Sequence, residues 1–136
     1  MTNLDLEPLY MLLSDPKVMH FLEPPYTRKQ VSAFLRKGLS EKPPVYSVEV
    51  NGNFLGYVIY HPYEEDSIEI GWVLLPEYWG KGYASRLTKQ MIDKAVSDGK
   101  TLVIECDPKQ EVTKHIAQKF GFSWAESSDG LDVYRL

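Results

Sequence analysis

The dipeptide Asn51-Gly52 is the sequence feature that most constrains the fold of this chain. Before it, Tyr46, Val48 and Val50 alternate with polar residues, and residues 54–60 after it form a second apolar segment. An Asn-Gly pair accepts positive φ angles at both central positions of a type I′ turn, which joins antiparallel strands. The sequence therefore predicts a β-hairpin and, with it, an antiparallel sheet.

The sheet is expected to continue after this hairpin. We predict a polar loop over residues 61–66, a third strand over residues 67–75 and a fourth strand over residues 101–105. An amphipathic helix precedes the fourth strand and is capped by Gly99; its apolar stripe is Ala84, Leu87, Met91 and Ala95. Neighbouring strands joined through a helix lie parallel. Asp129-Gly130 predicts a final hairpin.

Three further helices are predicted from apolar stripes and end signals. The first has one apolar face, made by Leu6, Leu9, Tyr10 and Leu13. Asp15-Pro16 then has the pattern of an N-cap and the first residue of a short further turn. Residues 27–30 match a capping box between Thr27 and Gln30. The helix after this box has the stripe Val31, Phe34, Leu35 and Leu39 and is stopped by Pro43 and Pro44. The last helix carries Val112, Ile116 and Phe120 and is closed by Gly121.

The predicted order is ααβββαβαββ, an α+β fold with one mixed, mostly antiparallel sheet flanked by helices. We expect a single domain over residues 1–136, because a chain of this length with 43% hydrophobic residues supports one core. One cysteine, no signal-peptide pattern and no apolar run of membrane length predict a cytoplasmic protein without membrane association. The net charge of −4 argues against a nucleic-acid-binding surface.

The segment over residues 79–84, WGKGYA, joins the third strand to the long helix. A helix N-terminus leaves backbone N–H groups unpaired and carries the positive end of the helix dipole. Gly80 and Gly82 would let a diphosphate approach those groups, while Lys81 adds a positive charge and Ala84 keeps the helix start open. The segment therefore suits a pyrophosphate.

Other interpretations of this segment remain to be weighed. A Gly-x-Gly before a helix also occurs as a simple tight turn, which would leave an unrelated fold open. A P-loop is excluded because its Gly-Lys-Ser/Thr ending is absent. A dinucleotide-binding turn would have a third glycine where this chain has Ser85, and it would follow a parallel βαβ unit.

The segment resembles the motif Arg/Gln-x-x-Gly-x-Gly/Ala of the GNAT N-acetyltransferase superfamily. Trp79 stands at the Arg/Gln place, as in the branch that includes the ribosomal-protein alanine acetyltransferases, and Gly82 and Ala84 match the other two places. The resemblance also covers residues 15–19, 68–72 and 119–122, and so extends over nearly the whole chain in the family's order.

The resemblance implies that the chain binds acetyl-CoA. In this family the third strand and its parallel neighbour splay apart, and the pantetheine arm pairs with the exposed backbone. The Leu74 N–H would also stabilise the thioester oxyanion. The implied cofactor-binding residues are Val73, Leu74, Leu75, Trp79, Gly80, Lys81, Gly82, Tyr83, Ala84, Ser85, Gln110 and Thr113.

The chain departs from the family pattern in three places. The usual first strand is short or missing, because a helix is predicted almost from Met1. Gln110 and Thr113 replace the family's Asn and Ser before the Lys-x-Gly-Phe signature. Ala117 occupies the place of the tyrosine that acts as general acid in many members. We therefore expect the acid to be absent or supplied from elsewhere.

The implied reaction is direct transfer of an acetyl group from acetyl-CoA to a primary amine of a small molecule or a protein N-terminus. The amine must lose a proton, and a carboxylate could accept it. Glu69 is the first candidate and Glu105 the second, with a solvent-facing Glu69 and a loop-anchoring Glu105 as the alternatives. A catalytically weak acyl-CoA-binding module, acting as a sensor or partner domain, is the alternative function that Ala117 favours.

The remaining chemistry-bearing residues carry weaker predictions. Cys106 is expected to be a small buried hydrophobe. The three histidines have no metal-ligand spacing, so we predict no metal. Tyr63 and the loop around it are the candidate acceptor contact. We expect a monomer or a homodimer.

Overall fold

The hairpin predicted at Asn51-Gly52 is present in the computed structural model, which describes residues 1–136. Asn51 and Gly52 have φ angles of 52° and 79°, as a type I′ turn requires. The turn joins β1 (Val45–Val50) to β2 (Asn53–Glu64), and the two strands pair antiparallel. The dipeptide therefore acts as predicted.

Six strands form one mixed sheet in the order β1-β2-β3-β4-β6-β5. The other strands are β3 (Ser67–Leu74), β4 (Thr101–Cys106), β5 (Ser123–Ser128) and β6 (Leu131–Arg135). β3 and β4 are parallel, whereas β6 pairs antiparallel with both β4 and β5. The parallel neighbour and the final hairpin were both predicted, and the turn residues Asp129 and Gly130 have positive φ angles.

Five α-helices accompany the sheet: α1 (Leu6–Leu13), α2 (Pro16–Met19), α3 (Arg28–Gly38), α4 (Tyr83–Ser97) and α5 (Glu111–Lys119). The element order matches the prediction once the short α2 is counted. A 3₁₀ turn over Asn3–Asp5 precedes α1, so no strand opens the chain. None of the helices is long and apolar enough to cross a membrane.

Residue contacts divide the chain into two compact units. Unit 1 comprises Met1–Ile59 and Trp72–Lys81, and unit 2 comprises Tyr60–Gly71 and Gly82–Leu136. Strands β2 and β3 each contribute residues to both units.

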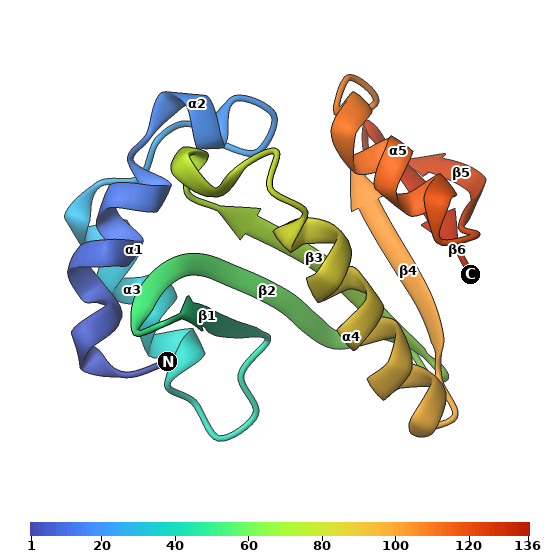
Figure 1. The fold of residues 1–136 in the computed structure, drawn as a ribbon, viewed down its shortest axis with the longest axis horizontal. Coiled ribbons are helices and arrows are strands. Elements are labelled where there is room, and N and C mark those ends of the chain that lie inside the picture. Colours follow the sequence, from blue (N-terminus) through green and yellow to red (C-terminus); the bar gives the residue numbers. More distant parts are fainter. The chain divides into compact units, whose positions relative to one another are not determined.

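Unit 1 buries the apolar faces of its helices against one another and against β1. Helices α1 and α3 lie side by side (Figure 1). The predicted capping box of Thr27 and Gln30 starts α3, and the Asp15 side chain accepts a hydrogen bond from the Lys17 N–H at the start of α2. The buried core of this unit is Leu9, Leu12, Leu13, Met19, Val31, Leu35, Val45, Tyr57 and Val73.

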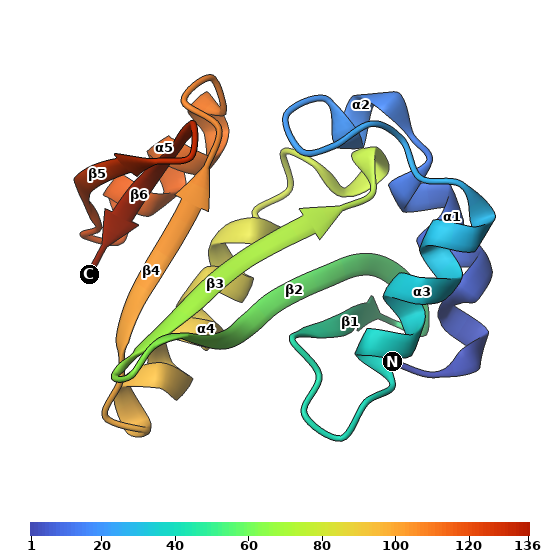
Figure 2. The same ribbon diagram turned by 180° about the vertical axis from the view of Figure 1, so that it is seen from behind.

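Unit 2 carries its helices on one face of its strands. Figures 1 and 2 show α4 and α5 on the same side of β3, β4 and β6, with no helix of this unit crossing the opposite side of β3 and β4. Ile68 and Ile70 on β3 are buried, and Glu69 between them is only partly covered. Ile104 and Cys106 on β4 are likewise buried around Glu105. Alternation along a strand therefore directs both carboxylates to the face opposite these buried residues.

Four local predictions were wrong. Residues 61–64 extend β2, so only Glu65 and Asp66 form the turn to β3. The strand is prolonged because Tyr63 and Glu64 bond to β4 and β6 side chains, a pairing that local polarity does not reveal. In β1, Val45 is buried and Tyr46 is exposed, and a bulge after Val48 interrupts the alternation.

The other two wrong predictions concern helix ends and faces. Helix α3 ends at Gly38, well before Pro43, because the Ser40 hydroxyl bonds the Lys37 carbonyl there, and Leu39 is left exposed. Val112 lies on the exposed side of α5, where Ile116 and Ala117 are the buried residues.

Candidate active site

The glycine segment enters α4 through two residues in left-handed conformations. Gly80 and Gly82 have φ angles of 71° and 84°, and Gly82 is the N-cap of α4 without a side-chain cap. A β-carbon at Gly80 would meet no atom within 4 Å, and one at Gly82 would meet only the Arg86 guanidinium, at 4.0 Å. The start of α4 is therefore open to a ligand that accepts hydrogen bonds from its first N–H groups.

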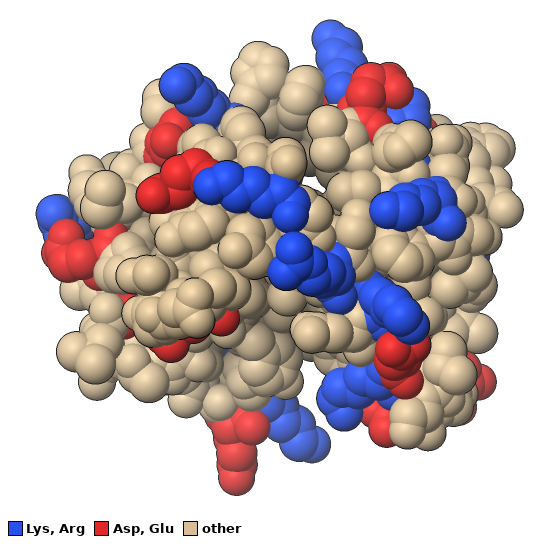
Figure 3. Space-filling view, viewed as in Figure 1, with Lys and Arg blue, Asp and Glu red and all other residues tan.

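Basic side chains gather around the first turn of α4. The Lys119 Nζ lies 3.5 Å from the Ser85 Oγ, and the Arg86 guanidinium stands 5.1 Å from the centre of the Tyr83 ring. Figure 3 shows blue side chains following the course of α4 across this face. Farther along the helix, Lys89 and Lys94 are paired with aspartates. The positive charge available to a ligand is thus concentrated at the start of α4.

In unit 1, the end of β3 is held by backbone and indole hydrogen bonds. The Leu75 N–H donates to the Leu55 carbonyl at 2.8 Å. The Trp79 indole N–H donates to the Leu74 carbonyl, also at 2.8 Å, while the Trp79 side chain remains 48% exposed. Trp79 therefore fixes the chain direction between β3 and the glycines. Val73 and Leu74 are buried.

The pairing between β3 and β4 is short. It runs from Ser67 opposite Thr101 to Glu69 opposite Val103. Beyond Val103, β4 continues to Cys106, where it pairs with β6. Glu69 thus stands at the last paired position of the two parallel strands.

Four side chains of unit 2 form what we call the Glu69 cluster: His61, Tyr63, Glu69 and Glu105. The His61 Nε2 lies 3.2 Å from the Glu69 Oε1, and the Tyr63 hydroxyl donates to the Glu105 Oε1 at 2.5 Å. The Glu69 side chain is 19% exposed, so it is partly covered beside His61. The cluster brings together both predicted carboxylates and Tyr63.

Three charged side chains outside the Glu69 cluster, Arg135, Glu64 and Glu126, lie near Tyr63 or pair with one another. The Arg135 guanidinium lies 5.7 Å from the centre of the Tyr63 ring and forms a 2.7 Å ion pair with Glu64. A weaker contact of 3.5 Å joins Arg135 to Glu126. Arg135 is thereby neutralised by carboxylates outside the cluster.

Burial and neighbouring charges shift the protonation of the cluster. Burial raises the pKa of the Glu69 carboxyl; the nearby His61 lowers that pKa, and the Glu105 carboxylate raises it. The hydrogen bond to Glu105 is the main cause that raises the pKa of Tyr63 to about 12. A partly exposed carboxyl group with a raised pKa is suited to accept a proton from an amine.

Other residues singled out in the sequence lie at the end of β4 and in and before α5. The Gln110 side chain accepts a hydrogen bond from the Asp107 N–H ahead of α5, and Thr113 is partly buried. Ala117 is fully buried in α5, where it carries no acid. Cys106 is buried, as predicted.

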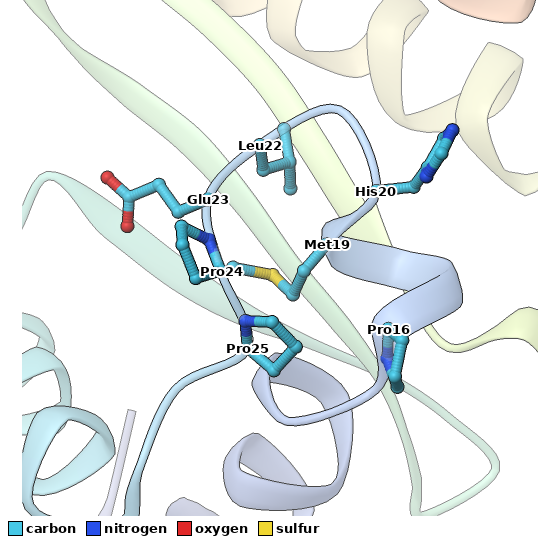
Figure 4. A pocket seen from close by; sticks show the side chains of 7 residues that line it. All are labelled: Pro16, Met19, His20, Leu22, Glu23, Pro24 and Pro25. Atoms are coloured by element: carbon cyan, nitrogen blue, oxygen red, sulfur yellow. The ribbon is translucent and has the colours of Figure 1, made fainter.

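A cavity in unit 1 is lined by none of the predicted site residues. It has a volume of about 400 Å³ and lies between α2 and the loop that follows it (Figure 4). Its lining residues are Pro16, Met19, His20, Leu22, Glu23, Pro24 and Pro25.

Sequence reasoning missed three residues of the site. His61 was considered only as a metal ligand, and it becomes visible once β2 is extended across the turn from Glu69. Arg86 and Lys119 lie near the start of α4. A basic residue on the first turn of the helix was the available signal for Arg86, whereas Lys119 comes from another helix.

Comparison with known proteins decides the family. A model of the "Acetyltransferase (GNAT) domain" matches residues 1–123. The chain belongs to the GNAT acetyltransferase family. The alternative of an unrelated fold is therefore wrong, and the resemblance seen in the sequence is confirmed.

Individual GNAT proteins are similar over most of the chain. It is 25% identical over 123 residues to the "Uncharacterized N-acetyltransferase YnaD" of Bacillus subtilis (strain 168), covering 86% of this chain and 72% of that protein. A GNAT-family acetyltransferase structure from Bacillus anthracis superposes with a TM-score of 0.86 at 22% identity, covering 99% of this chain and 89% of that one. For the ribosomal-protein-alanine N-acetyltransferase from Brucella melitensis, the values are 0.77 and 18%, with 100% and 96% covered. The two structures establish the shared fold.

Proposed function

We propose that this GNAT protein transfers an acetyl group from acetyl-CoA to a primary amine, of a small molecule or a protein N-terminus, by direct attack in a ternary complex. The observation that carries the proposal is the Glu69 cluster, a partly buried acid–base group at the last paired position of β3 and β4. Family membership supports the acetyl-transfer chemistry.

The cofactor half of the proposal rests on the start of α4. The two positive-φ glycines leave open space, and the first turn offers its N–H groups and Arg86 to a pyrophosphate. Lys119, from the end of α5, reaches Ser85 on the same turn. These residues fit the diphosphate of CoA. The full set proposed to hold acetyl-CoA is the one implied by the family: the backbone of Val73, Leu74 and Leu75, the segment Trp79, Gly80, Lys81, Gly82, Tyr83, Ala84 and Ser85, and Gln110 and Thr113.

The proposed reaction requires one proton acceptor and one oxyanion donor. Acetyl-CoA supplies the thioester; the amine nitrogen forms the new C–N bond, the C–S bond breaks, and the products are an amide and CoA thiol. Glu69 would accept the proton that the amine loses, and the Leu74 N–H would donate to the oxyanion. An alkyl thiol has a pKa near about 8.5, so a thiolate can leave at neutral pH without an acid at Ala117.

Glu69 is preferred over Glu105 as the base because of their partners. The Glu105 carboxylate already accepts the Tyr63 hydroxyl at 2.5 Å. Glu69 contacts a histidine that can itself exchange a proton. Glu105 is then proposed to hold Tyr63 and to add negative charge beside the base.

One observation favours the second candidate, a CoA-binding module with weak catalysis. The place of the family's general-acid tyrosine is a fully buried alanine, Ala117. Such a module would need the same open start of α4. It would differ in turnover and not in CoA binding.

Thiol release from acetyl-CoA, followed across a panel of amines and N-terminal peptides, tests the proposed function. Glu69→Gln is expected to lower kcat about 10²-fold or more with the preferred acceptor, because general-base catalysis contributes on this scale. Glu65→Gln is the matched control, since Glu65 is exposed in the β2–β3 turn of the same unit. Full activity of Glu69→Gln would exclude Glu69 as the base. CoA binding without turnover on every acceptor would favour the module instead.

A further inference from the structure

His61 makes two contacts that together define its role. Its Nδ1 lies 2.9 Å from the Pro62 carbonyl oxygen, and its Nε2 lies 3.2 Å from the Glu69 Oε1. A carbonyl oxygen only accepts hydrogen bonds, so this contact favours the tautomer with a hydrogen on Nδ1. The other ring nitrogen, Nε2, is then the one that faces Glu69.

The contact with Glu69 is favourable in only one charge arrangement of the ionised carboxylate. When Nε2 is protonated, the imidazolium attracts the carboxylate; when it is not, a lone pair faces a negative oxygen. Because the Glu69 side chain is 19% exposed, solvent screens this interaction only in part.

We infer that His61 is a positioning residue of the acid–base site: its ring, placed by the Pro62 carbonyl, holds the Glu69 carboxylate in orientation and favours its ionised form. This inference rests on the proposed role of Glu69. The contact with the Pro62 carbonyl fixes the orientation of the imidazole ring, and the ring in turn fixes the orientation of the Glu69 carboxylate. Glu69 then accepts the amine proton from a fixed place on the face of β3 opposite Ile68 and Ile70.

The other charged groups of this region either act against ionisation of Glu69 or are paired with one another. Glu105 on β4 acts against ionisation of Glu69, and Tyr63 on β2 is engaged with Glu105. Arg135 on β6 stands over the Tyr63 ring and is paired with Glu64. Among the groups acting on Glu69, His61 is thus the one that favours its charged form.

The test measures the titration of Glu69 directly, by carboxyl ¹³C NMR, and needs no activity. His61→Gln removes the cation, so the pKa of Glu69 is expected to rise further above that in the wild type. His61→Arg keeps a cation at every accessible pH and is expected to bring it back to the wild-type midpoint or below. His115→Gln, at an exposed histidine of the same unit, is the control and should change nothing.

The pH dependence of acetyl transfer supplies the second measurement. A base works when deprotonated, so kcat/KM rises with pH through the pKa of Glu69. In His61→Gln the rising limb of kcat/KM should move to higher pH, and His61→Arg should restore its position.

The outcomes separate this inference from the proposed function. An unchanged Glu69 titration in folded His61→Gln overturns the role of His61, whatever the activity. If His61→Gln does not fold, His61→Arg decides, because a midpoint above that of the wild type would contradict the inference. A protein without acetyl transfer but with the expected NMR shifts would refute the function and leave the His61–Glu69 coupling standing.

Discussion

At the scale of single residues, burial decides what a reactive side chain can do. Cys106 is 3% exposed at the end of β4. Burial and, after it, the Asp132 carboxylate raise the pKa of the Cys106 thiol to about 11. The thiolate is the nucleophilic form, so a raised pKa makes this thiol inert near neutral pH.

This leads to a prediction for alkylation of Cys106 by iodoacetamide at about pH 8. The native protein should react roughly a hundredfold more slowly than the urea-unfolded chain, whose thiol has an ordinary pKa. Asp132→Asn should accelerate labelling of the native protein, because it removes a cause of the raised pKa. Equal rates in the native and unfolded states would show that Cys106 is accessible and activated.

At the scale of elements, the close approach of β2 to the end of β3 requires a glycine at position 56. Gly56 has a φ of 152°, and a β-carbon there would lie 2.0 Å from the Val73 carbonyl oxygen and 2.9 Å from the Leu74 Cα. Both atoms are backbone, so they cannot move aside alone. The β1–β2 register also shifts next to this position, between Val48 and Glu49.

Gly56→Ala is therefore expected to lower the free energy of unfolding by about 3 kcal/mol, since it adds steric overlap to an unfavourable φ. Gly130→Ala is the matched control: its φ is 79°, and nothing lies within 4 Å of its β-carbon. It should cost only about 1 kcal/mol. Urea denaturation measures both variants, and equal losses would mean that the strand crossing relaxes around the methyl group.

The same scale explains what sequence reasoning could reach. The Asn51-Gly52 turn and the Thr27–Gln30 box were predicted because each depends on residues a few positions apart. The extension of β2 over residues 61–64 depends on Glu105 and Arg135, which lie far along the chain. The His61–Glu69 contact follows from that extension, and so was missed.

At the scale of the whole molecule, the connection rule predicted the parallel pairing of β3 and β4, because a helix joins them. The position of β6 between β4 and β5 was not predicted. A hairpin can add to a sheet through either of its strands, and the alternation of β5 and β6 does not choose between them. The glycine segment was found because its backbone requirement, two left-handed residues before a helix, is written directly in two glycines.

A ligand that binds only the folded chain must stabilise all of it, which gives a test of the proposed CoA site. At a CoA concentration about 100 times Kd, the gain is about 2.7 kcal/mol, or roughly 8 °C in Tm for a chain of this size. Gly82→Glu should abolish this increase, because it places a negative side chain at the start of α4. Gly130→Glu introduces the same residue at a similar φ, 79° against 84°, in the final hairpin, and should keep the increase.

An increase retained in folded Gly82→Glu would mean that the pyrophosphate binds elsewhere. If the wild-type Tm does not rise at millimolar CoA, neither the enzyme nor the CoA-binding module describes this protein.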